Sequence, residues 1–169
     1  MRLFFALWPD EASRAHLAGL GASIATRTRG RAVPGAKLHL TLSFLGEVPE
    51  DRVAAAEEAA SRVRGRAFEI DIDTVGSFRE AGVAWAGPSR LPQELTALQS
   101  CLESELRRAR FTLDSRPFAA HATLARRIAR SLPQESVPPI PWHVRDFVLV
   151  RSETGRGGYV VMERWNLEG

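Results

Sequence analysis

The chain has 169 residues, of which 44% are hydrophobic and 25% charged, and its formal net charge is +3. These values are typical of one folded domain over residues 1–169 and exclude a disordered chain or a fibrous repeat. No stretch reaches the roughly 20 apolar residues of a membrane-spanning helix. The apolar run at the start ends after Trp8, too early for a signal peptide. We therefore expect a cytoplasmic monomer with no membrane partner.

Strands and helices are predicted to alternate along the chain. The apolar residues 3–8 predict a strand, and Pro9 and Asp10 then open a helical pattern that ends in an arginine-rich loop at 26–36. Residues 37–45 alternate strictly between polar and apolar side chains, which predicts a strand with one polar face. The remaining expected elements are a helix at 49–63, strands at 68–78 and 82–87, a helix at 91–110, a turn at 114–120, a strand at 121–126, a linker or edge segment at 136–142, and a closing hairpin of 144–152 and 158–167.

The basic residues are biased towards arginine. Lys37 is the only lysine, so 22 of the 23 basic residues are arginines. Genome composition can produce this bias, but the planar fork of arginine also suits phosphate recognition. Three arginines at 27, 29 and 31 precede the strand at 37–45, where they either guide a polyanion or are simply solvated. The single cysteine, Cys101, is expected in the core rather than as a nucleophile.

The tetrapeptide His-x-Thr-Leu occurs twice, at residues 39–42 and 121–124. The two histidines are 82 positions apart, about half the chain, and each copy follows a predicted helix. A repeat of this size suggests two similar lobes related by a pseudo-twofold axis. The polar faces of the two strands would then meet in a shared cleft.

The residue types of the motif suit phosphoryl chemistry. Imidazoles titrate near neutral pH, so one can take a proton from an attacking water while the other gives one to the departing oxygen. A threonine two residues further on points to the same strand face and can donate to a phosphate oxygen. A single copy would usually be a structural pair, and a zinc site would need further ligands that neither motif brings. We expect no metal or other cofactor.

Four segments resemble the 2H phosphoesterase superfamily, in particular its RNA 2′,3′-cyclic phosphodiesterase branch, also called 2′-5′ RNA ligases. They are RLFFALWPDE, KLHLTLSFLGEVPEDRV, RPFAAHATLAR and VLVRSETGRGGYVVMERWNL. The resemblance implies an α+β bilobal duplicated fold, in which two antiparallel β-sheets line a central cleft and the helices lie outside. It also implies metal-free chemistry on RNA ends, with His39 as proton donor to the leaving 3′ oxygen and His121 as base towards water. At residues 32–36 this chain has Ala-Val-Pro-Gly-Ala, where members often carry an aromatic residue and a Pro-Pro pair, so their base-stacking role is not carried over.

The expected activity is that of an RNA 2′,3′-cyclic 3′-phosphodiesterase, a hydrolase that converts cyclic phosphate ends of RNA to 2′-phosphomonoesters. Run backwards, the same site would form a 2′-5′ linkage. One alternative is a 2H phosphodiesterase for small cyclic nucleotides, and another is a non-catalytic RNA-end binding module. Retention of both complete motifs favours an enzyme.

Four further residues are expected at the substrate. Thr41 and Thr123 would bind the phosphate, and Ser43 shares the His39 face by strict alternation, so it would line the cleft. The same alternation puts Phe44 in the core. It also puts Arg126 opposite His121, so this arginine would contact phosphate or RNA only where the strand ends or twists; Arg127 has the better parity.

Overall fold

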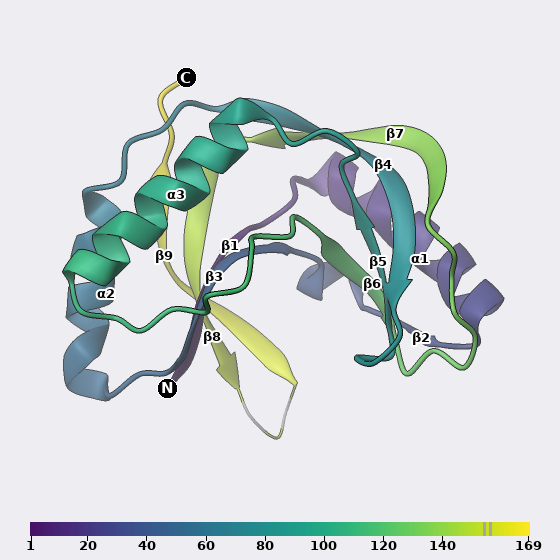
Figure 1. The fold of residues 1–169 in the computed structure, drawn as a ribbon, viewed down its shortest axis with the longest axis horizontal. Coiled ribbons are helices and arrows are strands. Elements are labelled where there is room, and N and C mark those ends of the chain that lie inside the picture. The colour runs from purple at the N-terminus through teal and green to yellow at the C-terminus, as the bar shows by residue number, and fades with distance from the viewer. Residues whose placement is uncertain (154, 156) are drawn as a thin grey trace.

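The computed structural model describes residues 1–153, 155 and 157–169 (Figure 1). Its strands form one nine-stranded sheet in the order β7-β4-β5-β6-β3-β1-β8-β9, with β2 beside β6, and every pairing between strands is antiparallel. The helices are α1 (Glu11–Thr28), α2 (Val53–Ser61) and α3 (Gln93–Arg108), and the strands are β1 (Arg2–Leu7), β2 (Arg31–Ala32), β3 (Leu40–Glu47), β4 (Phe68–Phe78), β5 (Val83–Gly87), β6 (Ala122–Arg126), β7 (Glu135–Val144), β8 (Asp146–Glu153) and β9 (Gly158–Asn166).

The sheet consists of two halves joined through one residue pair. β3 and β6, which follow the two histidines, meet at Leu40 and Ala122. β1, β8 and β9 extend the sheet on the β3 side, and β5, β4 and β7 extend it on the β6 side. The α+β class is therefore confirmed, and the two expected sheets are the halves of one continuous sheet. The repeated unit is strand–helix–strand, β1-α1-β3 and β5-α3-β6.

The helix of each repeat packs on the other half of the sheet. α1 follows β1 but lies against β6 and β7, whereas α3 follows β5 but lies with α2 over the half that contains β3 and β9 (Figure 1). The approach of α1 is close, since a Cβ on Gly21 would lie 3.3 Å from the carbonyl oxygen of Leu124. Because each repeat covers the sheet of the other, the apolar faces are buried only when both halves are present.

β1 is buried on both faces, which explains its continuous apolar run. Leu3, Phe5 and Leu7 point into the main core between the sheet and the helices. The alternate residues point to the opposite face. There they belong to a smaller group, the cleft-side cluster, which consists of Phe4, Ala6, Val148 and Val150, with Trp8 and Tyr159 packed against it.

Most predicted elements are confirmed within a few residues, and the strand predicted at 68–78 coincides with β4. The proline-rich stretch forms β7 at an edge of the sheet, where the missing N–H groups of proline are tolerated. β8 and β9 pair as expected, although positions 154 and 156 of their connection lie outside the described residues. Among the described residues, no helix is both long and apolar enough to cross a membrane.

The predicted loop at 26–36 is partly wrong. α1 continues to Thr28, and Arg29 caps it in the left-handed conformation. Arg27 is in the last turn of the helix and pairs with Glu135. Arg31 belongs to β2, where it lies opposite Arg126 of β6. Hydrogen bonding to β6 therefore turns an expected loop into a short strand.

Candidate active site

The two motifs meet where the halves of the sheet join. His39 and His121 each directly precede one member of the Leu40–Ala122 pair. In the antiparallel register that this pair sets, Thr123 comes opposite His39 and Thr41 comes opposite His121. The four side chains then gather around this one pair. His121 is near enough to His39 for its charge to act on the His39 ring.

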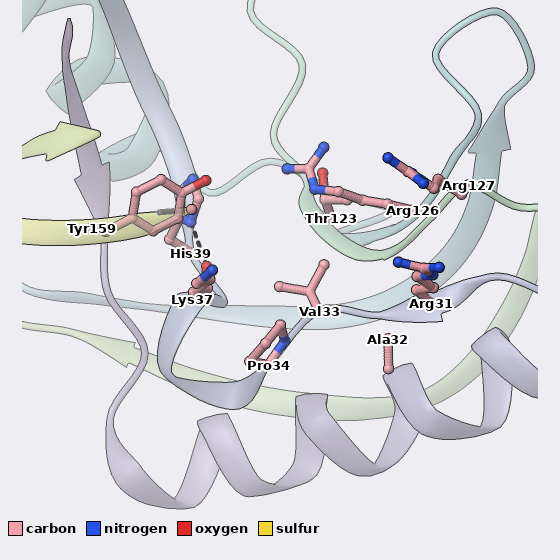
Figure 2. A pocket seen from close by; sticks show the side chains of 11 residues that line it. Arg31, Ala32, Val33, Pro34, Lys37, His39, Thr123, Arg126, Arg127 and Tyr159 are labelled. Carbon is pink, nitrogen blue, oxygen red and sulfur yellow. Dashed lines mark hydrogen bonds between the residues drawn. The ribbon is translucent and has the colours of Figure 1, made fainter. Parts of the chain in front are cut away.

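Both imidazoles are held in the same way. Nδ1 of His39 lies 2.7 Å from the carbonyl oxygen of Lys37, and Nδ1 of His121 lies 2.7 Å from that of Ala119 (Figure 2 shows the His39 bond). A carbonyl oxygen only accepts, so each Nδ1 is the protonated nitrogen of the ring. Nε2 is left as the reactive atom in both: it accepts a proton when the ring is neutral and donates one when the ring is charged.

The surroundings of His39 are aromatic. Its ring stacks on Trp8 with centroids 5.1 Å apart and planes 8° apart, and Tyr159 meets it edge-on at 5.2 Å. Phe4 of the cleft-side cluster lies 5.0 Å away. This burial lowers the pKa of His39, the hydrogen bond to Lys37 acts in the opposite direction, and the positive charges of Arg126 and His121 lower the pKa further. The neutral imidazole is therefore favoured when no anion is bound.

His121 has a more open environment. Its ring meets Phe78 edge-on at 5.1 Å, and Phe78, which is 40% exposed, stacks on Trp85 at 5.6 Å. Two identical side chains with identical hydrogen bonds thus stand in different surroundings. Such a difference is what gives two equivalent groups distinct proton-transfer roles.

A β-bulge follows the threonine in both motifs. In β3, Thr41 pairs with Ala6 and Ser43 with Phe5, so Leu42 is the extra residue. In β6, Thr123 pairs with Trp85 and Ala125 with Ala84, so Leu124 is the extra residue. Two consecutive residues are buried at each bulge. The residue that follows them is exposed, where strict alternation would have placed it in the core.

The bulge in β3 overturns the expected places of Ser43 and Phe44. Ser43 is buried and lies opposite Phe5, whose side chain belongs to the main core, so the serine faces away from the cleft. Phe44 lies opposite Phe4, its ring 5.9 Å from that of Phe4, and it is 55% exposed. Strict alternation fails here because one inserted residue exchanges the two faces.

The bulge in β6 corrects the parity of Arg126 in the same way. This arginine occupies the position that Phe44 has in the first motif and lies on the cleft side, where it shares a cavity with His39 and Thr123. β6 includes Arg126, so the bulge at Leu124, and not the end of the strand, brings this side chain to the cleft side. Both copies place a small residue directly after the leucine, as Thr-Leu-Ser-Phe and Thr-Leu-Ala-Arg, and the bulge falls at the same position in each.

A cavity of about 530 Å³ opens beside His39 (Figure 2). Of the predicted site residues, His39, Thr123 and Arg126 line it, whereas His121 and Thr41 lie outside its lining. Within the described part of the chain, no acidic residue lines it and none of its four cationic side chains takes part in an ion pair. The cations are Arg31, Lys37, Arg126 and Arg127. A cavity with this charge favours an anionic ligand.

No group of three His, Cys, Asp or Glu side chains that could hold a metal ion is found among the described residues. Cys101 is partly buried against the main core. The polar groups that converge at the motifs are imidazoles, hydroxyls and guanidinium groups, which suit proton transfer and phosphate binding.

Comparison with known proteins agrees with the geometry. The sequence model of the 2′-5′ RNA ligase superfamily matches residues 9–156. The chain is 33% identical to the RNA 2′,3′-cyclic phosphodiesterase of Escherichia coli, with 98% of this chain and 96% of that protein covered. It is 34% identical to the RNA 2′,3′-cyclic phosphodiesterase of Thermus thermophilus, with 100% of this chain and 91% of that protein covered.

Solved structures show the same fold. The E. coli LigT crystal structure with 3′-AMP superimposes with a TM-score of 0.86 at 32% identity and covers 98% of this chain and 97% of its own. The LigT structure with phosphate gives a TM-score of 0.83 at 30% identity, with coverages of 99% and 98%.

Proposed function

Because the chain belongs to the 2′-5′ RNA ligase superfamily, we propose that it hydrolyses 2′,3′-cyclic phosphate ends of RNA to 2′-phosphomonoesters. The observation that carries this proposal is the pair of identically held histidines at the junction of the two halves, beside a cavity whose charged side chains are all cationic. A single domain, a monomer and a cytoplasmic location remain predictions.

The reaction requires one proton acceptor and one proton donor. Water attacks phosphorus and forms a new P–O bond, while the bond from phosphorus to the ribose O3′ breaks. Nε2 of His121 takes the proton of the water, and Nε2 of His39 gives its proton to O3′. Thr41 and Thr123 donate hydrogen bonds to the non-bridging oxygens, whose charge grows in the transition state. Proton exchange with solvent restores both rings, and a 5′-hydroxyl that attacks phosphorus in place of the water would form a 2′-5′ linkage while the same bond to O3′ breaks.

The role of His39 as donor depends on the substrate. The lowered pKa of the ring favours its neutral form in the free protein. A bound cyclic phosphate brings a negative charge beside the ring and raises the pKa again. The stacked face of Trp8 also favours the cation. We therefore propose that substrate binding and protonation of His39 are coupled.

The Arg126→Met variant should show which limb of the pH profile of kcat/KM belongs to His39. Removing this cation removes one cause of the lowered pKa of His39, so that pKa rises. If His39 is the donor, the alkaline limb of kcat/KM moves to higher pH, because the donor stays protonated longer. The measurement is kcat/KM against pH for both proteins on one cyclic-phosphate substrate. A shift confined to the acid limb would make His39 the base and contradict the assignment.

Hydrolysis should survive exhaustive treatment with EDTA. The convergent groups of the proposed site supply both proton transfers and the phosphate contacts without a metal ligand set. The measurement is the initial rate before and after chelation and after return of single divalent ions. Loss of activity that one particular ion restores would contradict this mechanism.

The activity itself is tested with an oligoribonucleotide that ends in a 2′,3′-cyclic phosphate. Hydrolysis in ¹⁸O-labelled water should give a terminal 2′-phosphate that carries one labelled oxygen, read by mass spectrometry together with ³¹P NMR. A terminal 3′-phosphate, or binding without turnover, would reject the proposal; the second result would favour a non-catalytic RNA-end binding module.

A further inference from the structure

The cavity beside His39 extends well past the reacting groups. Figure 2 shows His39, Lys37 and Tyr159 at one end, Arg31 and Arg127 at the other, and Thr123 between them with the guanidinium group of Arg126 beside it. Arg31 and Arg127 therefore carry the positive lining of the cavity past the reacting groups, and Arg126 lies between them and His39.

The arginines are held close together at an energetic cost. Arg31 and Arg126 lie directly opposite each other on paired strands, an arrangement that repulsion destabilises. Arg127 has a φ of 52°, in the left-handed region that non-glycine residues seldom adopt. Among the residues that the structure describes, none that lines the cavity is acidic and could offset these charges. An anion bound among the three guanidinium groups would relieve the repulsion.

The position of Arg31 is rigid. β2 is paired with β6 through Arg31 and Ala32, and the Val33 N–H donates to the Leu124 carbonyl oxygen at 2.8 Å. The preceding backbone is tightly packed, since a Cβ on Gly30 would lie 2.9 Å from the carbonyl oxygen of Arg126. Backbone held in this way needs little ordering when a ligand binds.

From these observations we infer a second anion subsite, formed by Arg31, Arg126 and Arg127, that binds the phosphodiester on the 5′ side of the terminal nucleotide. This inference rests on the proposed function. A substrate whose cyclic phosphate is at its 3′ end carries further phosphates only in the 5′ direction. The protein therefore selects an RNA strand of two or more nucleotides over a cyclic mononucleotide.

Three substrates distinguish the effect of the charge on the linkage from the effect of the rest of the second nucleotide on kcat/KM. They are a 2′,3′-cyclic mononucleotide, the dinucleotide with the same terminal residue, and that dinucleotide with a neutral methylphosphonate linkage. The wild-type protein should show a kcat/KM roughly 10–100-fold higher for the natural dinucleotide than for the methylphosphonate, as expected for hydrogen bonds to a charged group. The methylphosphonate should resemble the mononucleotide.

Arg31→Met should bring the ratio of natural to methylphosphonate dinucleotide close to one. It should also reduce the slope of log kcat/KM against log salt for the natural dinucleotide by about 0.7, the value for one lost contact to a single strand. Arg145→Met is the matched control, because Arg145 is an exposed arginine between β7 and β8, outside the cavity lining. It should keep the wild-type ratio.

Equal wild-type kcat/KM for the natural and methylphosphonate dinucleotides would overturn the subsite and leave the proposed function standing. An equal fall of the ratio in Arg31→Met and Arg145→Met would also overturn it, because net charge alone would then explain the effect. Absence of hydrolysis of all three substrates would instead overturn the proposed function.

Discussion

Alanine in place of either His39 or His121 should lower kcat for hydrolysis of a cyclic phosphate end by roughly 10²–10⁴-fold, the usual contribution of one general acid or base. Each ring presents a single reactive nitrogen, since Nδ1 is bonded to a carbonyl in both. Removing one ring leaves either the water or the leaving oxygen without a proton-transfer partner. The double variant should lose much less than the product of the two single losses, because the groups act on one transition state.

Single-turnover rates on a cyclic-phosphate dinucleotide measure this loss, and circular dichroism checks that the variants fold. His143→Ala is the matched control, because His143 is exposed on β7 and pairs with Glu69, outside the lining of the cavity. It should turn over at the wild-type rate. A variant at His39 or His121 that also keeps that rate would show that the proposed site does not carry the reaction.

Valine in place of Thr41 or Thr123 should lower kcat by roughly 10²–10³-fold, as removal of a single transition-state hydrogen-bond donor does elsewhere. Valine keeps the branched shape and the strand propensity of threonine and removes only the hydroxyl. Thr41 and Thr123 each directly follow one member of the Leu40–Ala122 pair, so both lie at the junction of the two motifs. Because charge on the non-bridging oxygens grows during the reaction, kcat should fall far more than KM rises.

Serine at the same positions provides the test of cause, since Thr41→Ser and Thr123→Ser restore the donor and should recover most of the rate. Thr26→Val is a control for the substitution itself, because the hydroxyl of Thr26 bonds within α1 to Ala22, on an exposed part of the helix. If the serine variants were as slow as the valine variants, packing rather than a hydrogen bond would explain the effect.

Local patterns were sufficient to predict most helices and strands, the duplication and the candidate reacting groups. The periods of apolar residues located α1, α3 and β4, and the proline-rich stretch indicated an edge segment because proline cannot donate to a neighbouring strand. The repeated His-x-Thr indicated duplication, because an internal repeat explains why an uncommon pattern occurs twice in one chain. These features depend on residues close together in the chain, so sequence alone carries them.

Tertiary structure decided how the two copies meet and which side chains reach the cleft. The Leu40–Ala122 pair joins residues 82 positions apart, and only long-range strand pairing creates it. The bulges at Leu42 and Leu124 arise from the register against β1 and β5, and they moved Ser43 into the core and Phe44 and Arg126 to the cleft side. The pairing of β2 with β6 brought Arg31 opposite Arg126. A period of two specifies alternation along a strand, but the neighbouring strand determines where that alternation slips by one residue.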